Sequence, residues 1–155
     1  MSVNVGEQTA IEKEAMMTPF LVACPSFQTQ WERFLAEWAD DPVLVENGGD
    51  GSLPYYLALS DLANHLIGKL ETGDTKEFSA AFEVVEDWIV RGSHYVSEAA
   101  VVGLLEDLTN EARYSKKEVS DFLPWMGPTT KRWLAEVVDF WDRLDKGNFR
   151  PLSID

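Results

Sequence analysis

The stretch SHYVSEAAVVGLLEDLTN, residues 93–110, decides the fold of this 155-residue chain. Ser93 is suited to cap a helix, because its hydroxyl can accept a hydrogen bond from a free amide of the first turn. Apolar residues then recur at the spacing of one helical face, namely Val101, Leu104, Leu105, Leu108 and Ala112. The first turns are apolar on most other sides as well, and such a helix is normally buried between neighbours. We therefore expect a central, buried helix.

The last turns of this helix carry a polar strip, formed by Gly103, Glu106, Asp107, Asn110 and Glu111. It has three open interpretations. The strip is a solvated helix face, as charged residues usually are, or a carboxylate site for a divalent cation or for acid–base catalysis. Alternatively it faces a basic protein partner, together with Glu83, Glu86 and Asp87 of the preceding helix. In that case Gly103 would let side chains of the partner approach the backbone.

Other segments repeat the apolar period of a helix. We expect helices over residues 8–23 (with a break at Pro19), 26–40, 54–72, 75–91, 115–123 and 129–147. Thr75 is expected to cap the fourth of these, and Ser115 with Glu118 forms a predicted capping box. The buried face of the last helix is predicted to hold Trp133, Leu134, Val137, Val138, Trp141 and Leu144.

No stretch shows the period-two alternation of a β-strand. The predicted class is all-α, as an antiparallel helical bundle or a short stack of helical hairpins with about six to seven helices. We expect one domain over residues 8–147, with loose tails at 1–7 and 148–155. Residues 43–45 are predicted to be an anchored loop, and residues 47–52, which are rich in Gly, a flexible one.

The net charge of −14 is concentrated in the first part of the chain. Residues 1–111 contain 5 basic and 20 acidic residues, whereas residues 112–155 contain 8 and 7. A field this negative repels nucleic acid and anionic lipid and favours cationic partners. We therefore expect no nucleic-acid binding and no membrane binding, and a partner with a basic surface. An acidic surface also keeps a protein soluble, and the charge alone does not distinguish this role from partner binding.

The chain has one cysteine and no apolar run long enough for a membrane span, which predicts a cytoplasmic protein without disulfides. Residues 21–24 imitate the end of a lipoprotein signal. The charged residues 12–14 and Pro19 break the pattern that such a signal requires.

Patterns of known chemistry are missing from the sequence. The glycines at 48–51 lack the lysine and the preceding strand of a phosphate-binding loop, and Cys24 and Ser93 lack a base that is oriented to activate them. Asp61 and His65 stand one helical turn apart and could chelate a metal, although such a pair is more often a solvated contact. We expect no catalytic residues, no metal site and no cofactor.

Three stretches carry a family resemblance: residues 56–63 (YLALSDLA), 97–108 (SEAAVVGLLEDL) and 122–128 (FLPWMGP). Together they resemble small, acidic, all-helical bacterial immunity proteins of polymorphic and contact-delivered toxin systems, over roughly residues 27–142. The resemblance implies a protein that binds and blocks a toxin domain and has no catalysis of its own.

The expected function is therefore that of an immunity protein, which neutralises a cognate toxin in bacterial competition. Its partner-binding face would comprise Glu83, Glu86, Asp87, Glu106, Asp107, Asn110 and Glu111. Trp88 and Trp125 are aromatics of the type that anchor interfaces, although six Trp in one small domain must mostly be buried. The alternatives are a helical adaptor or chaperone for a secreted effector and, third, a carboxylate-metal hydrolase.

Overall fold

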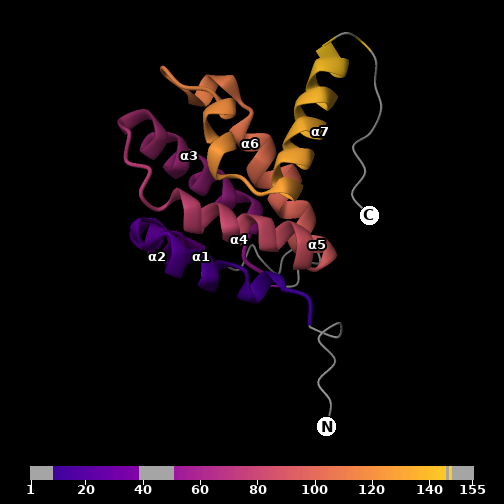
Figure 1. Ribbon diagram of the computed structural model, residues 1–155. Coiled ribbons are helices and arrows are strands. Elements are labelled where there is room, and N and C mark those ends of the chain that lie inside the picture. Colours follow the sequence, from indigo (N-terminus) through magenta and orange to yellow (C-terminus); the bar gives the residue numbers. More distant parts are fainter. Residues whose placement is uncertain (1–8, 39–50, 146, 148–155) are drawn as a thin grey trace.

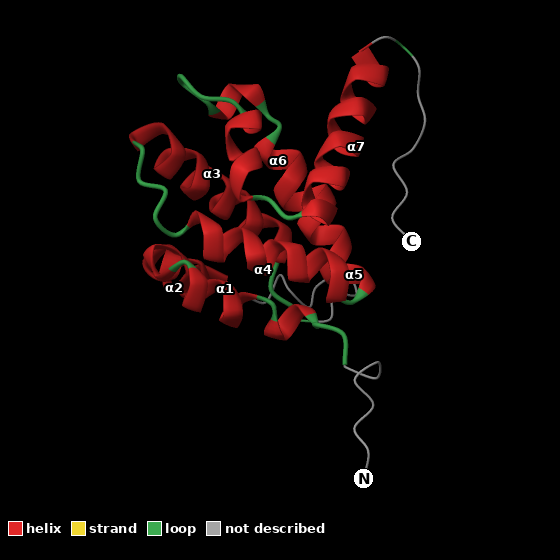
Figure 2. Ribbon diagram, viewed as in Figure 1, coloured by secondary structure: helices red, strands yellow, loops and turns green. Residues whose placement is uncertain are grey.

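The computed structural model describes residues 9–38, 51–145 and 147. Within these ranges the regular secondary structure is helical (Figure 2), apart from one isolated β-bridge between Ile11 and Gly92. The prediction of an all-α bundle of about seven helices is confirmed. The predicted tails at 1–7 and 148–155, the loop at 43–45 and most of the loop at 47–52 lie outside the described residues.

The described α-helices are, in chain order, α1 (Met17–Ala23), α2 (Gln28–Trp38), α3 (Tyr55–Thr72), α4 (Phe78–Arg91), α5 (His94–Glu98), α6 (Glu106–Leu108) and α7 (Pro128–Asp145). Between α5 and α6 the chain forms a π-helix, Ala99–Leu105. Shorter 3-10 turns are Lys13–Ala15, Pro25–Phe27, Glu111–Arg113 and Val119–Trp125. Because α5, the π-helix and α6 follow one another without a break, the predicted central helix is one continuous rod.

The central rod packs against α3, α4 and α7, so it lies at the centre of the bundle. Ser93 caps it as predicted, and its hydroxyl accepts a hydrogen bond of 3.2 Å from the amide of Val96. The predicted apolar face is buried as far as Leu108. Ala112 is exposed instead, because the rod ends before it and a separate 3-10 turn begins at Glu111.

Gly103 is buried against α3, so the expected approach of a partner at this position is wrong. A Cβ atom on Gly103 would lie 3.4 Å from the side chains of both Leu59 and Tyr56. The missing side chain therefore permits close packing of two helices of the same domain.

Two predicted helix caps are displaced, by two residues for α4 and by three residues for the 3-10 turn Val119–Trp125. Helix α4 begins at Phe78 after Glu77, and Thr75 contributes only its backbone carbonyl, which accepts from the amide of Phe78. The capping box lies at Glu118 and Asp121 and not at Ser115. Near both starts the chain makes contacts that no local pattern indicates: Glu77 accepts from Ser26 and Cys24, and the amides of Ser115 to Lys117 donate to Glu71.

Figure 1 shows α1 and α2 on one side of α4, with α6 and α7 on the other. The predicted buried face of α7 is correct only as far as Val137. Leu134 and Val137 are buried, whereas Val138 is 37% and Trp141 41% exposed. Figure 1 shows the C-terminal half of α7 projecting away from the rest of the bundle, and Val138 and Trp141 are the apolar side chains exposed there.

Candidate functional site

A groove of about 880 Å³ lies between α6 and the second half of α7. We call it the acidic groove, and it is lined by Glu106, Asp107, Thr109, Asn110, Glu111, Ala112, Tyr114, Ser115, Lys117, Glu118, Val119, Val138, Trp141, Asp142 and Asp145. Among these described residues six side chains are acidic and one is basic. Four members of the predicted partner-binding set, from Glu106 to Glu111, lie in this groove.

The π-helix places the two carboxylates at the start of the acidic groove. The amide of Glu106 reaches the carbonyl of Val101, five residues earlier, as well as that of Gly103. A π-helix is rare and is frequently found next to a functional site, because its wider turn changes the direction of the side chains that follow. Here the side chains that follow are Glu106 and Asp107, both of which are half-buried.

Burial raises the pKa of Glu106, and the neighbouring charge of Asp107 raises it further. Burial also raises the pKa of Asp107, although the nearby charge of Arg113 opposes this shift. A carboxylate with a raised pKa is held in its charged form at a cost in stability. Such perturbed groups cluster at functional sites, although ion-pair networks also produce them.

Arg113 is the cation that faces this pair. One guanidinium nitrogen lies 3.5 Å from Asp107, and the same side chain donates to the carbonyl and hydroxyl of Ser60 and, at 2.6 Å, to Asn64 on α3. Arg113 is thus held by α3 and stays beside Asp107. Asp107 is therefore already paired with a cation of the same domain. The carboxylate of Glu106 is left as the acceptor that a cationic side chain from outside could reach.

One wall of the acidic groove is held by Glu71 of α3. Its carboxylate accepts hydrogen bonds from the backbone amides of Ser115, Lys116 and Lys117, at 2.8 to 3.0 Å. Asn110, predicted as a contact residue, caps the following 3-10 turn by accepting from the amide of Ala112. The wall is therefore fixed by internal hydrogen bonds, while Glu111 remains exposed.

The other three predicted partner-binding residues line a different hollow. Glu83, Glu86 and Asp87 border it together with Val22 of α1 and Trp125. This hollow shares no lining residue with the acidic groove. The structure thus divides the predicted set into two groups.

Glu86 has a structural task in this second hollow. Its carboxylate accepts hydrogen bonds from the amides of Thr129 and Thr130 and from the hydroxyl of Thr130. Burial alone would raise the pKa of Glu86, but these hydrogen bonds outweigh it and hold the pKa below its usual range. Glu86 therefore binds the first turn of α7, where an anion is favourable.

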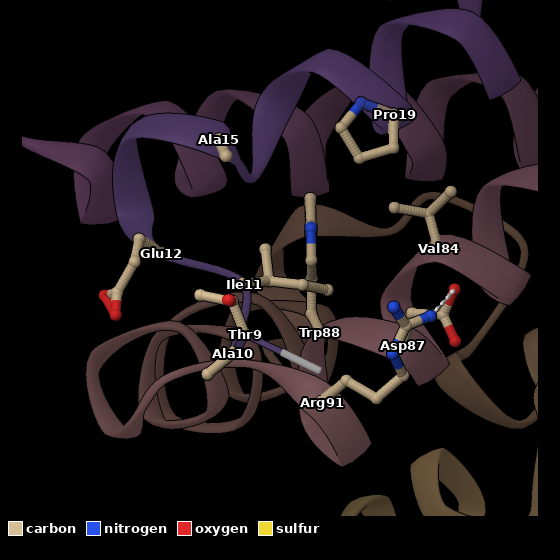
Figure 3. Close-up of a pocket in the computed structure, with 10 residues that line it drawn as sticks. All are labelled: Thr9, Ala10, Ile11, Glu12, Ala15, Pro19, Val84, Asp87, Trp88 and Arg91. Carbon is tan, nitrogen blue, oxygen red and sulfur yellow. Dashed lines mark ion pairs between the residues drawn. The ribbon is translucent and has the colours of Figure 1, made fainter. Parts of the chain in front are cut away.

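A third hollow, of about 470 Å³, lies where the N-terminal segment meets α1 and α4 (Figure 3). Trp88 forms part of its lining but is fully buried, and its indole donates to the carbonyl of Met16. Asp87 pairs with Arg91 at 3.8 Å (Figure 3), so opposite charges meet at this rim. The hollow is lined mainly by apolar residues, and its charged side chains are Glu12, Asp87 and Arg91, so it holds fewer carboxylates than the acidic groove.

A polar cluster that the sequence pattern did not reveal joins three helices. His65 of α3 is 2.8 Å from the hydroxyl of Ser26, and that hydroxyl donates to Glu77, which also accepts from the thiol of Cys24 at 3.2 Å. Asp61, the predicted neighbour of His65, is exposed. Burial raises the pKa of Cys24 to about 11. Since Cys24 and Glu77 are 53 positions apart, no local spacing could have indicated their contact.

The fold and the site together define an all-α domain with an acidic, partly apolar groove. The chain belongs to the family described as a domain of unknown function, DUF7674, whose model matches residues 17–142. No curated protein and no solved structure matches the chain. Among the described helices, none combines the length and the apolar character that crossing a membrane requires.

Proposed function

We propose that this protein binds a basic segment of a partner protein in its acidic groove and performs no chemistry on it. The observation that carries the proposal is the combination of six carboxylates with the exposed apolar side chains of Val138 and Trp141 in one groove. Exposed aromatic residues surrounded by polar groups are typical of interaction sites. Charge complementarity selects a cationic partner.

The proposed binding proceeds by attraction and then anchoring. The negative field of the chain accelerates the encounter with a basic partner. A Lys or Arg side chain of the partner then pairs with Glu106, which relieves the repulsion between Glu106 and Asp107. Trp141 packs against the apolar part of the same partner segment and slows its dissociation.

In the finer form of the proposal the partner is a cognate toxin domain, and this protein is a cytoplasmic immunity protein that keeps the toxin inactive. The resemblance of residues 97–108 and 122–128 to such immunity proteins supports this form, as does the strongly acidic first part of the chain. The runner-up is an adaptor or chaperone that escorts an effector through the same groove.

Capture of the tagged protein's partner from a lysate of its own source, followed by binding measurements with the purified partner, tests the proposal. The partner should bind in equal stoichiometry, with affinity that falls as salt is raised. If expression of the partner alone stops growth and co-expression restores it, the immunity form is supported. A partner that is harmless when expressed alone would favour the adaptor. An affinity that changes neither with salt nor with substitutions in the acidic groove would contradict the proposal.

A further inference from the structure

Cys24, His65 and Glu77 meet where the end of α1, the middle of α3 and the start of α4 come together. The sulfur, an imidazole nitrogen and a carboxylate oxygen all lie within 4.8 Å of one another. Thiolate, imidazole and carboxylate are the ligand types that zinc takes in proteins. We propose that these three side chains bind one zinc ion, independently of the acidic groove.

The distances are close to those of a tetrahedral zinc site. Bonds of about 2.0 to 2.3 Å place neighbouring ligand atoms about 3.3 to 3.8 Å apart. The sulfur of Cys24 is already 3.2 Å from Oε1 of Glu77. The imidazole nitrogen of His65 lies within 4.8 Å of both atoms, so the side chains must rotate to move their ligand atoms by about 1 Å and bring all three onto one ion.

The hydroxyl of Ser26 marks the centre of the site. It lies 2.8 Å from Nε2 of His65 and 3.7 Å from the sulfur of Cys24, and it donates a hydrogen bond to Glu77. One small polar group thus touches all three ligand side chains. Zinc takes this central position when it binds, and the Ser26 side chain rotates away from it.

Gln30 provides the support that a histidine ligand requires. Its side-chain amide is 2.8 Å from Nδ1 of His65, on the opposite side of the ring from Ser26. Because Ser26 donates to Glu77, Nε2 of His65 donates to Ser26, and Nδ1 accepts from Gln30. With zinc on Nε2 the imidazole proton lies on Nδ1, and the Gln30 amide turns so that its oxygen accepts that proton.

Charge and protons balance in this step. Cys24 loses its thiol proton to solvent and forms the zinc–sulfur bond, while the imidazole remains neutral with one proton. The thiolate and the carboxylate of Glu77 together carry two negative charges, which match the charge of Zn²⁺. Cys24 is 2% exposed and the ring of Phe27 lies 5.4 Å from that of His65, so the neutral complex is held in a largely apolar setting.

Titration of the full chain with Co²⁺ alone tests the proposal spectroscopically. Cys24 is the only cysteine, so a thiolate-to-cobalt charge-transfer band can arise only from this site. We expect the band to saturate at one equivalent of Co²⁺ and to disappear when one equivalent of Zn²⁺ is added. Absence of the band with Co²⁺ in excess would overturn the proposal.

Calorimetric titration with Zn²⁺ alone distinguishes this site from weak binding to the acidic surface. Cys24→Ala and His65→Asn should each weaken zinc binding at least about 100-fold. The matched control is His94→Asn, which changes the other histidine of the chain, exposed beside Glu98, and should leave the affinity unchanged. Zinc binding to Cys24→Ala with the affinity of the wild type would be surface binding and would contradict the proposal.

Discussion

Glu86 of α4 and Thr130 of α7 are joined by two hydrogen bonds to one carboxylate oxygen, 2.8 Å from the amide and 2.7 Å from the hydroxyl of Thr130. Thr130 is fully buried. This contact holds the first turn of α7 on α4 and leaves the second half of the helix projecting beside α6. The position of the acidic groove therefore depends on a carboxylate that lies outside it.

Glu86→Gln is expected to destabilise the isolated protein by about 1 to 2 kcal/mol, because it removes a charged acceptor from the N-terminus of α7. Urea unfolding measures the change. Glu83→Gln is the matched control on the same helix, where the side chain is exposed, and should stay within about 0.5 kcal/mol. Equal effects of the two substitutions would contradict the structural role of Glu86.

The contribution of Glu86 to stability should disappear in acid. Its pKa in the folded state lies below the ordinary value of 4.5, so its stabilisation is present above pH 4.5 and is lost as the pH falls through the folded pKa. Unfolding free energies of the wild type and Glu86→Gln, measured from pH 7 downward, should therefore converge. A difference that persists unchanged in acid would show that the charge of Glu86 is not involved.

Glu106→Gln should change the free energy of unfolding in the opposite direction to Glu86→Gln. We expect it to stabilise the isolated protein at neutral pH by up to about 0.5 kcal/mol. Because the folded pKa of Glu106 is raised, its protonated form is favoured in the fold, and that stability is lost as the pH rises through the folded pKa. The gain from Glu106→Gln should vanish below pH 4.5. Thermal unfolding at several pH values measures this gain. Destabilisation by Glu106→Gln at pH 7 would refute the account of Glu106 as a carboxylate that is kept for binding at a cost in stability.

Trp141→Ala should weaken binding of the captured partner by about 2 kcal/mol, roughly 30-fold, with only a small loss of stability. The side chain is 41% exposed on the projecting half of α7, so little of the core depends on it. Leu57→Ala, at an exposed apolar position of α3, is the control and should leave binding unchanged. Equal affinities of Trp141→Ala and the wild type would remove Trp141 as the anchor.

The sequence predicted the helices well because each has a local period. The apolar stripe of α3 and that of α4 are both buried as expected, and Gly73 with φ of +79° and Gly92 end these helices. Such features depend on neighbours in the chain, so spacing alone reveals them.

The site was predicted only in part, because its geometry depends on contacts between distant segments. Glu86 and Thr130 are 44 positions apart, and nothing near Glu86 in the sequence indicates that it caps another helix. The exposure of Trp141 was missed for a related reason. An apolar stripe predicts that a helix buries one face. It does not indicate at which residue the helices packed against that face end.

The most direct test of the acidic groove is a comparison of partner affinity between the wild type and three charge-reversed variants. The three pairs of substitutions to Lys are Glu106 with Asp107, Glu83 with Asp87, and Glu32 with Glu37 on α2, and each pair changes the net charge equally. We predict that the Glu106 and Asp107 pair weakens binding at least about 100-fold, because it reverses the charge inside the groove. The Glu32 and Glu37 pair should act only through the weaker, salt-screened overall field. Equal effects of all three pairs, or no effect of the first, would contradict binding in the acidic groove.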